Sequence, residues 1–223
     1  MGTNDATLAA LQRRGVPVVI GEGHPVPGTP GRDPGQGRDG GSRPAPRRPG
    51  PHPHRRDLAP LDNSRRSGVV DADRLVQADR TPTVNRLNGV RDVVEPLITW
   101  ETEASLVEHG HAAAVEILGT WVPTDERPTA IIAHSDLLAA GAVLGARELG
   151  LRVPEDLSVA GFDGLDLPWL SPDMLTTVHQ PLAEKGAELG RAVVSLLAGK
   201  EPQTIMLDVA LVAGTTTGPV PTR

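Results

Sequence analysis

The sequence predicts an α/β protein built on a parallel sheet. From residue 84 onward, short apolar runs of strand length alternate with longer stretches that repeat apolar residues at helical spacing. Glycine, proline and capping residues separate these runs. Strands that alternate with helices form parallel sheets, because each helix crosses over and packs back on the sheet. The 223 residues suffice for one large domain or for two smaller lobes, each with its own core.

The first expected elements are a helix and a strand within residues 4–20. Asn4 or Asp5 can cap the helical stretch "ATLAALQRR", and Gly15 ends it. The run "VPVVI" follows as a short buried strand. A helix that leads into a strand is half of a βαβ unit.

Residues 23–60 break this alternation. They hold 10 Pro and 8 Gly, with Val26 and Leu58 as the only larger aliphatic residues, so they cannot bury enough apolar area to offset chain entropy. Three interpretations are open: a basic disordered arm that touches nucleic acid, a flexible linker, or an out-of-frame translation of GC-rich DNA. The frameshift is favoured, because a structureless run of this length inside a compact domain indicates missing elements.

Regular elements return after this segment. The stretch "NRLNGVRDVVEP" and an amphipathic run over about 103–118 predict two helices, and "PTAIIA" predicts a strand. Ser135 then caps a helix from Asp136 to Leu149, which Gly150 closes.

The rest of the chain repeats the same pattern. The stretch "RVPEDLSVAGFD" reads as a turn, a strand over 157–160 and a glycine turn, and "LTTVHQ" as the next strand. A helix begins at Pro181 and ends at Gly199. The last apolar stretch, "TIMLDVALVAGTT", predicts one or two strands.

Polar side chains follow two of the predicted strands, and ligands of open parallel sheets lie beyond the carboxyl ends of the strands. Asp163 lies between Gly161 and Gly164, which let the backbone turn and leave the carboxylate accessible. A carboxylate can accept hydrogen bonds from two neighbouring sugar hydroxyls. Ser135 and Asp136 start a helix, where polar or anionic groups are favoured. The structural alternative is that Ser135 and Asp136 only cap the helix and Asp163 only forms an Asx-turn.

Two aromatic residues flank this acid. Phe162 is expected in the core. Trp169, on the loop that follows, could stack on a sugar or pack within a lobe, and the two interpretations are equal.

Composition excludes several classes of function. Residues 84–223 carry 9 basic and 19 acidic residues, a net charge of −10, which is unlike a nucleic-acid surface. There is no cysteine, no apolar run of membrane-spanning length, no signal peptide pattern and no nucleotide-binding glycine motif. The neighbours His134, Ser135 and Asp136 do not face one another as a catalytic set would. We therefore expect a cytoplasmic protein that is not an enzyme and needs no cofactor or metal.

Several motifs in order carry a family resemblance. The stretch "RPTAIIAHSDLLAAGAVLGARELGLRVPEDLSVAGFDGLDLPWLSPDMLTTVHQ" resembles the sensor domain of LacI/GalR-family transcriptional regulators, with a nearly gap-free match from about 127 to 214. The segments "LAALQRRGVPVVI", "HRRDLAPLDNS" and "RLNGVRD" resemble further parts of that family.

The resemblance implies a two-lobed, periplasmic-binding-protein-like fold with parallel sheets. It also implies a homodimer and a small-molecule effector, such as a sugar, in the cleft between the lobes. Matched motif by motif, the implied effector-binding residues are Arg86, Ser135, Asp136, Asp163 and Gln180. Trp169 joins them as an aromatic ring on which a sugar could stack.

The family's DNA-binding helix-turn-helix has no counterpart in this chain, so we expect contact with operator DNA only through a segment absent here. The first lobe is expected to be incomplete, with uncovered apolar faces that favour aggregation. The expected layout is a first-lobe remnant, the proline-rich segment, the second lobe and a return to the first lobe, at 1–22, 23–60, 61–180 and 181–223. The alternative function is a stand-alone sugar-binding protein of a transport system.

Overall fold

The computed structural model describes residues 10, 13–14, 18–19, 21–22, 55–94, 97–119, 127–201 and 203–221. The chain divides into two compact units. The first unit comprises Pro53–Pro181 and Asp208–Arg223, and the second comprises Thr3–His52 and Leu182–Leu207.

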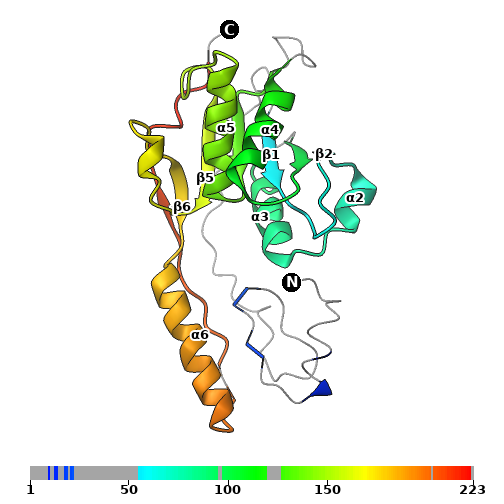
Figure 1. Ribbon diagram of the computed structural model, residues 1–223, viewed down its shortest axis with the longest axis vertical. Helices are drawn as coiled ribbons and strands as arrows, with labels where there is room; N and C mark the ends of the chain where they lie inside the picture. Colours follow the sequence, from blue (N-terminus) through cyan, green and yellow to red (C-terminus); the bar gives the residue numbers. More distant parts are fainter. Residues whose placement is uncertain are drawn as a thin grey trace. The chain divides into compact units, whose positions relative to one another are not determined.

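The first unit is built on one seven-stranded sheet, in the order β2-β3-β1-β4-β5-β6-β7. Figure 1 labels β1, β2, β5 and β6 of this sheet. The five inner strands run parallel, and β2 and β7 pair antiparallel at the two edges. The α/β class with a parallel sheet is therefore confirmed. In sheet order the strands are β2 (Gly68–Val69), β3 (Leu97–Glu101), β1 (Arg55–Ala59), β4 (Ala130–Ala133), β5 (Ser158–Asp163), β6 (Thr176–His179) and β7 (Ala210–Val212).

Helices connect these strands. The helix predicted after Ser135 forms as expected, since the Ser135 hydroxyl accepts a hydrogen bond from the backbone N–H of Leu138 and Gly150 adopts a φ of +74° at the other end. The helices of the first unit are α2 (Ala72–Val76), α3 (Thr81–Arg91), α4 (Val107–Leu118), α5 (Asp136–Glu148) and the 3₁₀ helix η1 (Pro168–Leu170).

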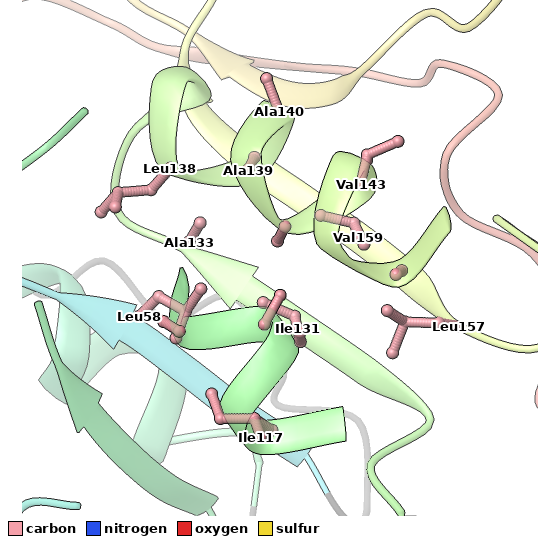
Figure 2. Packing of buried hydrophobic residues seen from close by; sticks show 14 of the residues in the cluster. Leu58, Ile117, Ile131, Ala133, Leu138, Ala139, Ala140, Val143, Leu157 and Val159 are labelled. Atoms are coloured by element: carbon pink, nitrogen blue, oxygen red, sulfur yellow. The ribbon is translucent and has the colours of Figure 1, made fainter. Parts of the chain in front are cut away.

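The apolar core lies between one face of the sheet and the helices α4 and α5. Leu58, Ile131 and Val159 come from three adjacent strands and are at most 1% exposed. Figure 2 shows these side chains in one buried cluster with Leu138 and Val143 of α5. Burial of such side chains from water is the main favourable term in the stability of this unit.

Helices α4 and α5 cross at van der Waals contact because glycines stand at the crossing. A Cβ atom at Gly141 of α5 would overlap the backbone carbonyl of Val107 in α4, and one at Gly110 of α4 would overlap the backbone of Leu138. The two helix backbones can approach this closely only where side chains are absent.

The observed boundaries differ from the expected layout in two places. Residues 55–59, expected within the proline-rich segment, form β1 inside the sheet between β3 and β4, where Leu58 and Ala59 are fully buried. Residues 208–223, expected to return to the first lobe, group with the first unit, because β7 pairs with β6 and the Thr216 hydroxyl donates to the carbonyl of Val159. Residues 23–54, the rest of the proline-rich segment, lie outside the described residues.

The described part of the second unit is mainly helix α6 (Leu182–Leu197). None of its residues is buried, and the side chains of Val194 and Leu197 are 67% and 72% exposed. Lys185 pairs with Glu22. Of the strand expected after Gly15, only residues 18–19 are described, and they are not in a strand.

Among the residues that the structure describes, no helix combines the length and the apolarity that crossing a membrane requires.

Candidate functional site

Three of the expected effector-binding residues meet at the carboxyl ends of the central strands. The Gln180 side-chain amide donates a 2.8 Å hydrogen bond to Oδ1 of Asp163. Nη1 of Arg86, from α3, lies 3.9 Å from the same oxygen. Residues more than 70 positions apart along the chain thus converge on one carboxylate, in the place where α/β sheets bind ligands.

Arg86 is held from three directions. Its Nη1 donates a 2.7 Å hydrogen bond to the backbone carbonyl of His134. Its guanidinium carbon lies 3.7 Å from the centre of the Phe162 ring, a cation–π contact. The nearby carboxylate of Asp163 offsets its positive charge. The fixed, planar guanidinium can donate several hydrogen bonds in known directions.

Asp163 has an unusual backbone. It is the last residue of β5, and its φ is +128°, a region that side-chain-bearing residues rarely adopt. Such strain is typical of functional positions when the surroundings enforce it. The next residue, Gly164, has φ +78°, and a Cβ there would overlap the His179 ring. This turn leaves the Asp163 side chain 25% exposed.

Asp136 is fully buried, and both oxygens of its carboxylate accept hydrogen bonds from other parts of the protein. Its Oδ1 accepts a 2.6 Å hydrogen bond from the Thr177 hydroxyl, and its Oδ2 accepts a 2.7 Å bond from the backbone N–H of Leu165. Gly161 has no room for a Cβ, because that atom would overlap Oδ1 of Asp136. Both carboxylate oxygens are therefore used within the protein, where they hold the loop that follows Asp163.

Ser135 and Trp169 lie differently from the three converging residues. Ser135 is 6% exposed, and its hydroxyl caps α5 through the 3.2 Å bond from Leu138 N–H. Trp169 lies in η1 and its side chain is 52% exposed. In the part of the chain that the structure describes, it makes no hydrogen bond to the cluster and no ring contact with Arg86.

Two contributors escaped the sequence interpretation. Phe162 was expected in the core, but it is only partly buried and supports Arg86 instead. The second is the backbone carbonyl of His134, which accepts a hydrogen bond from Arg86. The position of Phe162 next to Asp163 could have indicated its role at the site. A backbone acceptor such as the His134 carbonyl leaves no signal in the sequence.

A buried group of ion pairs lies away from these residues. Arg74 donates through Nε to Oε2 of the buried Glu101 at 2.8 Å, and Asp62 lies 2.7 Å from its Nη2. The hydrogen bonds to Glu101 are the main reason that the pKa of Arg74 is raised above its ordinary value. This pairing joins α2 to β3 and is structural.

No group of three or more histidine, aspartate or glutamate side chains within the described ranges could hold a metal ion. The chemistry that the cluster does offer is hydrogen bonding: a carboxylate acceptor, a guanidinium donor and an amide that can do both.

Comparison with known proteins places this geometry in context. The family described as "periplasmic binding protein-like domain" matches residues 52–217. The HTH-type transcriptional regulator DegA of Bacillus subtilis is 37% identical over 147 residues, which cover 62% of this chain and 42% of DegA. The HTH-type transcriptional repressor CytR of Escherichia coli K12 is 40% identical over 93 residues, 42% of this chain and 26% of CytR. The chain thus spans less than half the length of these curated relatives.

Solved structures of LacI-family regulators are also similar to this chain. A LacI-family transcriptional regulator from Corynebacterium glutamicum has a TM-score of 0.65 at 27% identity, over 75% of this chain and 50% of that protein. A LacI-family regulator from Enterococcus faecalis V583, crystallised with bound ribose, has a TM-score of 0.57 at 27% identity, over 75% and 55% of the two chains.

Proposed function

Because this chain belongs to the periplasmic binding protein-like domain family, in the form that LacI-type regulators carry, we propose that it binds a small polyhydroxylated effector through Arg86, Asp163 and Gln180. The observation that carries the proposal is the convergence of Gln180 and Arg86 on Asp163, whose backbone is strained at φ +128°. A neutral sugar fits this set, because Asp163 already offsets the charge of Arg86.

The neighbour from Enterococcus faecalis supports a pentose as the first effector to test, since it was crystallised with ribose. In the proposal, Asp163 accepts from two ribose hydroxyls while Arg86 and Gln180 donate to ring or hydroxyl oxygens. Trp169, which is half exposed on the following loop, supplies a ring on which the sugar can stack.

Ser135 and Asp136 enter the proposal with different roles. Asp136 acts by holding the loop after Asp163, since both of its oxygens are occupied. Ser135 would contact the effector only by exchanging its bond to Leu138 N–H for one to the ligand.

The relatives also support a role in transcription rather than in transport. We propose that the whole protein is a cytoplasmic, non-enzymatic regulator that works as a homodimer, and that effector binding shifts its affinity for operator DNA. The transport alternative is not favoured, because the relatives are transcriptional regulators.

A thermal-shift titration with a panel of pentoses and hexoses tests the effector proposal. At 100 times the dissociation constant, ribose should add about 2.7 kcal/mol to the free energy of unfolding. Asp163→Ala should remove this gain. Asp166→Ala, which changes an exposed acid on the same loop, should keep it. A gain that survives Asp163→Ala would remove Asp163 from the site.

A further inference from the structure

A carboxylate and an imidazole are buried together in the sheet. Asp57, at the centre of β1, is 0% exposed, and the His134 side chain, just after β4, is 4% exposed. His134 Nε2 lies 2.7 Å from Asp57 Oδ1, an ion-pair distance, although the ring and the carboxylate are not aligned for a hydrogen bond. A buried acid without compensation is costly, so this pair calls for an explanation.

The surroundings of Asp57 offer it little else. Its neighbours across the sheet are Thr99 in β3 and Ile132 in β4. Its second oxygen, the Thr99 hydroxyl and Nδ1 of His134 have no hydrogen-bond partner among the described residues. Within that part of the chain, His134 is the one ion-pair partner of Asp57. The 2.7 Å approach of Nε2 to Asp57 is therefore the one close polar contact that the described residues offer to the imidazole.

His134 also connects β1 to the proposed effector site. Its backbone N–H donates a 2.9 Å bond to the carbonyl of Leu58, and its own carbonyl accepts the 2.7 Å bond from Arg86. The side chain and the backbone N–H of His134 thus both contact β1, while its carbonyl contacts the guanidinium that lies over Phe162.

We propose that His134 is a positioning residue for the effector site: the contact with Asp57 fixes its backbone carbonyl, and this carbonyl orients Arg86. The inference rests on the proposed function only for its effect on effector affinity. Its effect on the geometry of Arg86 stands by itself and can be measured without any ligand.

The variants must separate positioning from folding. His134→Ala alone would leave Asp57 buried without a partner, a change that is strongly destabilising. The double variant Asp57→Val/His134→Leu replaces the pair with apolar side chains, which commonly preserves stability. A cooperative urea unfolding transition would show that the double variant is folded. Asp57→Asn, which removes only the charge, is the milder variant if the double variant does not fold.

Nuclear magnetic resonance of the ligand-free protein gives the direct readout. The Arg86 Nε–H signal should be displaced by the Phe162 ring, and Phe162→Leu identifies that displacement. The double variant should move the signal toward its position in Phe162→Leu, and Asp57→Asn should move it less in the same direction. An unmoved signal in a folded variant would show that the pair only packs, and would overturn the proposal.

Titration with D-ribose gives the second readout. The double variant should bind ribose about tenfold more weakly. This is the size of effect seen in metal sites when a group that orients a metal ligand, without touching the metal, is removed. In an Arg86→Lys background, the same change should have little further effect, because it acts through Arg86. Full additivity would contradict the proposal. If the wild type binds no sugar while the Arg86 signal still moves, the positioning role stands and the proposed effector is wrong.

Discussion

At the scale of single residues, backbone conformation decides what the site can offer. Asp163 presents its carboxylate because β5 ends in a strained residue followed by Gly164 at φ +78°. The sequence could predict the accessible acid, since an Asp between two glycines after a strand favours a turn. It could not predict that the Phe162 ring lies against the Arg86 guanidinium instead of in the core, because this contact depends on where α3 packs.

Gly164→Ala tests the importance of this turn. The new Cβ would overlap the His179 ring and stand at a positive φ, so the free energy of unfolding should fall by about 1–3 kcal/mol. Urea denaturation measures the change. The control is Gly89→Ala in α3, where a Cβ meets nothing and stability should rise by about 0.5–1 kcal/mol. Equal effects of the two substitutions would contradict this account.

The acid stability of the first unit should depend in part on Asp156. Hydrogen bonds from the Arg152 side chain and backbone lower the pKa of Asp156 to about 2 from an ordinary value of 3.8. The charged form therefore stabilises the folded state, fully above about pH 4, and this contribution is lost as the pH falls through about 2. Asp156→Asn should lower the urea midpoint clearly more at pH 6 than at pH 2, where part of the contribution is already lost. A constant difference at both pH values would rule out this role.

At the scale of elements, the sequence predicted the helices and strands whose ends have clear signals, such as a capping residue or a glycine. Helix α5 begins at the Ser135 cap and ends before Gly150, as expected. Strand β1 was missed, because "RRDLA" follows a proline-rich run and places the polar Asp57 where a buried strand normally has an apolar residue. Residues 55–59 form a strand in spite of this pattern because they pair with the neighbouring β3.

The crossing of α4 and α5 makes a sharp prediction. Gly141→Ala would push a methyl group into the backbone of α4, so it should cost about 1–3 kcal/mol of stability even though alanine favours helices. Gly89→Ala again serves as the control. A gain in stability from Gly141→Ala, measured by urea denaturation, would mean that the helices do not meet through these glycines.

At the scale of the whole molecule, the sequence predicted the family and the parallel sheet but not the division of the chain. Residues 208–223 belong with the first unit, because strand pairing of β7 with β6 outweighs their position after α6. That pairing joins segments more than 30 residues apart, so no local pattern signals it.

The exposed apolar side chains of α6 should promote association between chains. Val194→Glu/Leu197→Glu removes two of them, which are 67% and 72% exposed, and should reduce light scattering of concentrated protein. Ala198→Glu adds a charge to the same exposed region without removing a large apolar group and should have a smaller effect. Equal scattering from all three proteins would exclude this surface as the cause.

The central claim is that Asp163 is the acceptor around which the effector binds. A crystal structure of the protein with D-ribose tests it most directly. We predict ribose hydroxyls within hydrogen-bond distance of the Asp163 carboxylate, with Arg86 and Gln180 donating to the same sugar. Ribose bound elsewhere, with no sugar hydroxyl within hydrogen-bond distance of the Asp163 carboxylate, would contradict the account.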